Sequence, residues 1–453
     1  MLIRTPVLMV VAIVQTCWIA FAEAQTHPIS QSEIPLDLST GPLDNPTDGE
    51  LLVFDEVVEI ADAPWMRLRF ERVDLEPGSY LLITSLQDGA AQTLDRVSIA
   101  QWQNRTAYFN GSALRVQLYA GAETFGNGFA LDVVIRGELD PGGVISSQCG
   151  PTDDRVLSNE ASRGRLLDIG CTAFIFSTES CFMTAGHCLD FAADVVEFNV
   201  PPSQGNGNLQ HPGPEDQYTV VSASREFVIG GIGNDWGLFR VFANSNTGLM
   251  PYEAQGELVE LDTMFPELPE SIDLVGYGVD NGVDNQVQQR SVGPITAISG
   301  GSAPAVFHQA DTEGGSSGSA VISETTGKVI AIHTHAGCTT GGGGSNASTG
   351  ITNAGLQNAL IDYCVIDDTG VACEDIVAIG SQCTFNGRIR FRARFADDSH
   401  DGDTVTIAID GEPIVVPVLG HRARYQEAGF SGTHTVTLED PPDCVDDMIV
   451  ECP

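Results

Sequence analysis

Two side chains of this sequence could hold and move a proton as a pair. His187 follows the strand-like run Phe182–Ala185 and directly precedes Cys188. An imidazole acts as a general base only when it is held within hydrogen-bond reach of the group that it deprotonates, and a disulfide at the next residue would hold it there. Asp235 begins the largely apolar run Asp235–Val241. A buried carboxylate at that point would accept a hydrogen bond from the imidazole and stabilise its protonated form.

A serine in a glycine-rich loop would supply the nucleophile. Ser317 lies in the run Gly314-Gly-Ser-Ser-Gly318. Glycines allow a sharp turn in which backbone N–H groups point at one spot beside the hydroxyl, and this is the geometry of an oxyanion hole. Each of the three residues alone is more typical of a structural role. Their order and their intervals of 48 and 82 residues make them significant as a set.

Together the three segments resemble the chymotrypsin/trypsin-like serine peptidase family. Thr184–Cys188 is similar to the family's histidine motif, Asn234–Asp235 to its aspartate motif, and Gly315–Ser319 to its G-x-S-G-[GS] serine motif. The order histidine, aspartate, serine is the order of the family. Because a serine follows Gly318, the bacterial glutamyl and lysyl endopeptidase-like branches are closest in motif.

The resemblance implies a secreted serine endopeptidase that hydrolyses peptide bonds through an acyl-enzyme intermediate. Ser317 would be the nucleophile, His187 the general base and acid, and Asp235 the residue that orients the histidine. The N–H groups of Gly315 and Ser317 would form the oxyanion hole. In many animal members an aspartate that receives a new N-terminal amine stands where this chain has Ser316, so activation by that route is in doubt.

The same resemblance implies an all-β fold with a double six-stranded β-barrel over residues 149–364. The run Ile332–Gly337 would be the edge strand on which an extended substrate pairs, and 354–363 would be the family's closing helix.

The specificity residues leave two alternatives open. Asp311 stands six residues before the nucleophile, which would favour substrates with Arg or Lys before the scissile bond. Thr312 and His333 match positions that bind an acidic side chain in glutamyl endopeptidases, and Thr334 is a further substrate-binding candidate. Asp311 could equally be a loop acid, and His333 a core histidine.

The rest of the chain divides into segments that differ in composition and in apolar periodicity. Residues 1–24 resemble a signal peptide with a small-residue cleavage site at Ala22–Ala24. Residues 25–50 are rich in Pro, Ser, Asp and Gly, lack an apolar period, and are interpreted as a flexible leader. Residues 51–145 and 373–453 contain short alternating runs that predict β-sandwiches flanking the peptidase domain. The first sandwich is either a propeptide or a permanent accessory domain.

The composition disfavours some classes of binding partner. The formal net charge is −40, which disfavours nucleic acid and anionic membranes, so we expect no nucleic acid and no membrane contact after signal cleavage. The resemblance implies protein or peptide substrates, and we expect a monomer. Eleven cysteines, one of them in the signal peptide, suggest disulfides in an extracellular or periplasmic protein. We expect no metal and no cofactor. The first expected bridge is Cys171–Cys188, with Cys181 as a rival partner, and Cys149–Cys338 is a second.

Two other interpretations compete. Gly314–Gly318 also fits the nucleophile elbow of α/β-hydrolases, but that elbow leads from a strand into a helix, whereas Ala320–Ile332 here reads as strand, turn, strand. The alternative function is a binding or adhesion protein whose peptidase-like domain has lost activity. Intact residues at all three triad positions argue against it.

Overall fold

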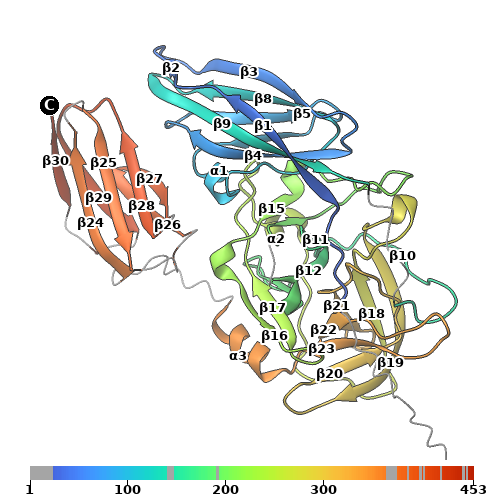
Figure 1. Ribbon diagram of the computed structural model, residues 1–453. Coiled ribbons are helices and arrows are strands. Elements are labelled where there is room, and N and C mark those ends of the chain that lie inside the picture. The colour runs from blue at the N-terminus through green and yellow to red at the C-terminus, as the bar shows by residue number, and fades with distance from the viewer. Residues whose placement is uncertain are drawn as a thin grey trace, which may run out of the picture.

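The computed structural model describes residues 24–139, 147–189, 193–363, 375–384, 387–396, 400, 403–418, 421–440, 444 and 447–453. Residues 1–23 of the expected signal peptide lie outside this part of the chain. Figure 1 shows three groups of β-sheets in chain order, from blue through green and yellow to red. Within the described residues, no helix is long and apolar enough to cross a membrane.

Two antiparallel sheets pack over one core in the N-terminal part. The strand order of the first sheet is β1 (Gln31–Ser39), β9 (Thr124–Gly137), β4 (Trp65–Asp74) and β7 (Phe109–Asn110), with β2 (Leu43–Asn45) also paired to β9. The order of the second is β3 (Leu51–Glu59), β8 (Ala113–Ala120), β5 (Tyr80–Ser85) and β6 (Ala91–Leu94). The short helix α1 (Ser98–Gln101) follows β6. Every second residue of β5 is buried, as expected for strands with one face on a core.

The expected leader at 25–50 is wrong as a description of residues 31–45, because these form β1 and β2. β1 pairs with β9 from Gln31↔Gly137 to Ser39↔Ala130. Exposure alternates along β1, with Ile34, Leu36 and Leu38 on its less exposed side. That period of two was present in the sequence but was obscured by Pro35 and the flanking acidic residues.

The next sheet carries the histidine and the aspartate. Its order is β15 (Gln217–Thr219), β14 (Val195–Glu197), β11 (Arg163–Leu167), β12 (Cys171–Ile175), β13 (Phe182–Thr184), β17 (Asp235–Phe239) and β16 (Glu226–Ile229). Short 3₁₀ turns, η1 (Gly186–Cys188), η2 (Pro214–Asp216) and η3 (Ser222–Ser224), and helix α2 (Pro251–Gln255) lie between or after these strands.

The following sheet carries the serine loop. Its order is β10 (Val156–Leu157), β19 (Gln289–Ser299), β18 (Ser271–Gly276), β21 (Ala320–Ser323), β22 (Val329–His335), β23 (Asn346–Gly350) and β20 (Ala305–His308). The 3₁₀ turn η4 (Gly282–Asp284) precedes β19, and helix α3 (Ala354–Tyr363) spans the residues that the sequence predicted.

The expectation of two closed barrels is correct for only one of these sheets. β19 also pairs with β20, so six strands of the second sheet form a closed ring. The first sheet has no such second ladder among the described residues. Beyond the ends of β15 and β17, the described residues form an isolated bridge, Val220↔Val241, in place of a ladder.

A second pair of sheets ends the chain. One sheet has the order β24 (Ile376–Cys383), β25 (Ile389–Phe395), β28 (Arg422–Glu427), and the other β27 (Glu412–Pro417), β26 (Thr404–Ile409), β29 (Gly432–Asp440), β30 (Met448–Cys452). A tight turn at Asp410–Gly411 joins β26 to β27, with φ of 53° and 87° at these residues. A disulfide, Cys383–Cys452, links the two sheets.

The N-terminal sandwich is attached to the peptidase region by buried polar contacts. Arg67 of β4 lies 2.5 Å from Asp194, and both side chains are almost fully buried. The Arg67 guanidinium also donates to Thr106 O at 2.6 Å and lies over the Tyr108 ring. Asp194 accepts a second bond, from Arg105, at 3.1 Å. Burial disfavours the charge of Arg67, but the nearby Asp194 raises its pKa above the usual value.

We predict that Arg67→Met lowers the free energy of unfolding by about 3–5 kcal/mol, because it leaves a buried carboxylate with a weaker partner. The measurement is equilibrium unfolding in denaturant. Arg115→Met is the control, since Arg115 pairs with Asp55 at an exposed position and should cost only about 0–1 kcal/mol. Equal losses in both variants would contradict a buried contact between sandwich and peptidase region.

Candidate active site

The histidine and the aspartate form a tight pair. The Asp235 carboxylate accepts the backbone N–H of His187 at 2.9 Å through Oδ1, and its Oδ2 lies 2.6 Å from His187 Nδ1. Asp235 is 1% exposed and His187 8%. β17 begins at Asp235, and its pairing with β13 brings the carboxylate to the end of the strand from which η1 and His187 follow. Two hydrogen bonds to one buried carboxylate fix the orientation of the imidazole.

The serine loop is turned sharply at a glycine. Gly318 has φ of +90°, and a Cβ at this position would lie 1.9 Å from Thr172 O, so no other residue fits. The turn is held by Gly318 N–H, which donates to His333 O at 2.8 Å. Ser317 is completely buried.

Thr172 of β12 connects the serine loop to both sheets. Its N–H donates to Ser317 O at 2.8 Å, and its hydroxyl donates to Gly315 O at 2.9 Å. The same hydroxyl accepts the N–H of Tyr277, which directly follows β18, at 3.0 Å. The preceding residue, Cys171, forms a disulfide with Cys188. β12 therefore contacts the serine loop at Gly315 and Ser317 and is covalently linked to the residue that follows His187.

The disulfides include both expected bridges. Cys171–Cys188 closes the histidine loop, and Cys149–Cys338 joins the start of the domain to the segment after β22. Cys181, the rival partner, is also disulfide-bonded but not to Cys188. Cys171, His187 and Cys188 would be close enough to share a metal ion, but the two sulfur atoms are bonded to each other.

A backbone carbonyl of the chain itself occupies the expected oxyanion hole. Gly315 N–H donates to Gln25 O at 2.7 Å, and Ser317 N–H donates to the same oxygen at 3.3 Å. Gln25 N–H donates to Ser317 Oγ at 3.0 Å. The two N–H groups predicted to bind an oxyanion therefore converge on one carbonyl oxygen, with the serine hydroxyl beside that peptide group.

The hydroxyl of Ser317 has two partners in this arrangement. It accepts the Gln25 N–H and donates to Thr334 O at 3.2 Å. His187 Nε2 is buried and has no hydrogen-bond partner among the described residues. Among the described residues the Ser317 hydroxyl is therefore not hydrogen-bonded to His187 Nε2, an arrangement that is common in the absence of a reacting complex.

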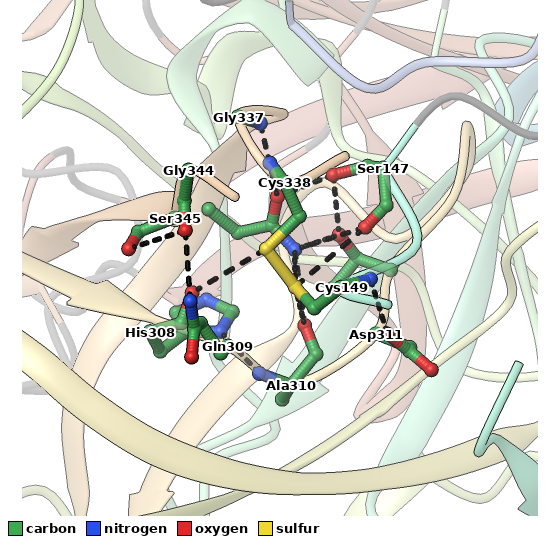
Figure 2. The surroundings of a disulfide bond; sticks show 12 residues. Ser147, Cys149, His308, Gln309, Ala310, Asp311, Gly337, Cys338, Gly344 and Ser345 are labelled. Carbon is green, nitrogen blue, oxygen red and sulfur yellow. Dashed lines mark hydrogen bonds between the residues drawn. A yellow bond between two sulfur atoms is a disulfide. The ribbon is translucent and has the colours of Figure 1, made fainter. Parts of the chain in front are cut away.

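The four specificity candidates have different surroundings. Only His333 reaches the Gln25 side chain among the described residues, and its Nε2 contacts Oε1 there. The Asp311 carboxylate accepts N–H groups of Cys149 at 2.6 Å and Asp154 at 2.7 Å, and Figure 2 shows it beside the disulfide. It therefore has the surroundings of a structural acid.

The hydroxyl groups of Thr312 and Thr334 likewise bond to other residues of the chain. Thr312 Oγ1 accepts from Asn346 at 2.9 Å, and Thr334 Oγ1 donates to Ala347 O at 3.1 Å. Neither hydroxyl bonds to Gln25 in the part of the chain that the structure describes.

Three contributors were missing from the sequence prediction. Thr172 could have been suspected only from its place after Cys171. His308, which lies 3.3 Å from His333 through Nε2 and Nδ1, has no motif around it. Gln25 was assigned to the leader, and its contacts with Ser317 span 292 residues. Contacts between residues so far apart in the chain leave no local pattern in the sequence.

Comparisons agree with the motifs. Residues 171–332 match the family model of the trypsin-like peptidase domain, so the chain contains such a domain. Similar solved structures include serine protease AL20 from an extremophilic microorganism, with 18% identity over 44% of this chain and 95% of that one (TM-score 0.35). Glu endopeptidase in complex with MPD matches with 16% identity over 47% and 97% (TM-score 0.35). Protease Anisep from Arthrobacter nicotinovorans matches with 14% identity over 45% and 91% (TM-score 0.29). A search of curated proteins found no match.

We predict that Thr172→Val destabilises the fold by about 1–3 kcal/mol for each polar group that it leaves buried without a partner. Those groups are the C=O of Gly315 and the N–H of Tyr277. Chemical denaturation measures the loss. Thr172→Ser keeps the hydroxyl and should lose much less, whereas equal losses would show that the methyl group, not the hydrogen bonds, matters.

Proposed function

We propose that this chain is a secreted serine endopeptidase that hydrolyses peptide bonds through Ser317, His187 and Asp235. The observation that carries the proposal is the convergence of the Gly315 and Ser317 N–H groups on one carbonyl oxygen. It is supported by the buried His187–Asp235 pair and by the match to the trypsin-like peptidase domain. A carbonyl in that position is the group that a serine nucleophile attacks.

The reaction follows from these contacts. Ser317 Oγ attacks the substrate carbonyl carbon while His187 Nε2 takes its proton, and the developing oxyanion is stabilised by the two N–H groups. His187 then donates the proton to the leaving amine. Water, deprotonated by His187, hydrolyses the acyl-enzyme. Asp235 holds the imidazole with Nε2 facing the nucleophile and stabilises the imidazolium.

Export is the second part of the proposal. The three bridges among the described cysteines are typical of oxidising compartments. This agrees with the signal-like residues 1–24 and favours an extracellular or periplasmic location.

We predict that a fluorophosphonate probe labels the mature protein and that Ser317→Ala abolishes labelling. The expected reason is that only the activated serine forms the phosphonyl ester. Gel fluorescence after labelling is the measurement, with Ser319→Ala, which changes a neighbouring serine of the same loop, as the control. Labelling that survives Ser317→Ala would exclude this nucleophile, and a correctly folded protein that is never labelled would favour the inactive binding protein.

We also predict that Asp235→Asn lowers kcat by about 10⁴-fold with little change in KM, because an amide cannot hold the required tautomer of the histidine. Initial rates on a peptide substrate measure this. An effect confined to KM would show that Asp235 acts in substrate binding instead.

A further inference from the structure

The residues that precede β1 lie along the site as an extended segment. Ala24 forms an antiparallel bridge with His335 at the end of β22. Beyond Gln25, His27 N–H donates to Gly170 O at 2.9 Å, and Ile29 N–H donates to Asp168 O at 3.2 Å. Pairing of an extended peptide with exposed backbone is a general mode of peptide recognition. We call residues 24–29 the cleft segment.

The cleft segment crosses the nucleophile at one peptide bond. Gln25 O accepts from both oxyanion-hole N–H groups, and Gln25 N–H donates to Ser317 Oγ. The carbonyl of the Gln25–Thr26 bond is therefore held where attack would occur. In a chain that still carries Ala24, flanking contacts lie on both sides of this bond, at His335 and at Gly170.

Two buried histidines form a hydrogen-bonded chain that ends at the side chain of Gln25. Ala310 N–H donates to His308 Nδ1 at 3.3 Å, so the proton of neutral His308 is on Nε2. That N–H faces His333 Nδ1 at 3.3 Å, which leaves the proton of His333 on Nε2, against Gln25 Oε1. Both imidazoles are fully buried. Burial lowers the pKa of His308 to about 4 and that of His333 well below its usual value, so both rings are neutral near neutral pH.

His333 thus presents a hydrogen-bond donor to the tip of the side chain at position 25. A side chain that ends in an acceptor oxygen, as in Gln or Glu, satisfies His333. A cationic side chain would meet this donor, and among the described residues no carboxylate is hydrogen-bonded to His333 or to the Gln25 side chain, since Asp311 bonds to Cys149 and Asp154 instead. Sites built around a hydrogen bond strongly reject analogues that lack the matching group.

We propose that the chain cleaves its own Gln25–Thr26 bond and that the uncut segment blocks the site until then. This rests on the proposed function. Ser317 Oγ forms an ester with the Gln25 carbonyl carbon, the carbon–nitrogen bond to Thr26 breaks, and His187 passes the serine proton to the Thr26 nitrogen. Water then hydrolyses the ester, which gives a Gln25 carboxylate and restores the hydroxyl. Departure of Gln25 vacates the oxyanion hole and the pocket at His333, whereas residues 26–29 stay on the chain.

The test compares the N-termini of secreted full-length variants by mass spectrometry. Wild type should begin at Thr26, whereas Ser317→Ala should begin at Gln25 or earlier. Gln25→Glu keeps the acceptor oxygen and should be cut like wild type. Gln25→Lys should be cut more slowly by at least about 100-fold. For wild type refolded from denaturant with residue 25 present, cleavage should be first-order and independent of protein concentration.

A second arm separates this inference from the proposed function. Gln25→Lys should withdraw residue 25 from the pocket, so this variant should react with the fluorophosphonate probe while residue 25 is still attached to the chain. If Gln25→Lys is labelled but wild type retains Gln25, self-cleavage is overturned and the peptidase stands. A Thr26 terminus in Ser317→Ala also overturns self-cleavage, because another peptidase would have cut. If neither wild type nor Gln25→Lys is labelled, the proposed function itself fails.

Discussion

The geometry of the site depends on the hydroxyl and backbone of one threonine at the junction of two sheets. Thr172 accepts from Tyr277, donates to Gly315, and donates through its N–H to Ser317. The serine loop belongs to the second sheet, yet its register is set by β12 of the first. Because Cys171 is bonded to Cys188, β12 also fixes the position of the residue that follows His187. Relative movement of the sheets would therefore disturb Ser317, the N–H groups of Gly315 and Ser317, and His187 together.

This junction explains why an incompletely closed first sheet is sufficient. A closed ring of strands makes the second sheet a stable frame for the loop, whereas the first needs to present only three things: Thr172, His187 and Asp235. All three lie on β12, β13–η1 and β17, which are neighbours in the strand order of that sheet. The irregular closure at Val220↔Val241 lies beyond the far end of β17 from Asp235 and leaves this part intact.

Local chemistry made much of the site predictable. His187, Asp235 and Ser317 stand in short motifs with characteristic glycines and flanking strands; the structure pairs His187 with Asp235 and turns the serine loop at Gly318. The closing helix at 354–363, which the family resemblance implied, is also present. What could not be predicted depends on contacts between distant residues.

The specificity residues illustrate that limit. Position alone made Asp311 and His333 equal candidates, and only their partners separate them. Asp311 bonds to Cys149 and Asp154, more than 150 positions earlier in the chain, while His333 bonds to His308 and Gln25. Similarly, the alternation in β1 gained meaning only from its pairing with β9.

The N-terminal sandwich has a clear physical relation to the cleft segment. β1 begins at Gln31, two residues after the last bond of the segment at Ile29, so the sandwich anchors the segment at a fixed distance from Ser317. Tethering of this kind raises the local concentration of the bond at the nucleophile. The sandwich also covers Asp194 with Arg67, and its loss would leave that carboxylate buried with a weaker partner. A cut at Gln25–Thr26 opens the site while preserving this contact, which favours a sandwich that remains with the peptidase domain after activation.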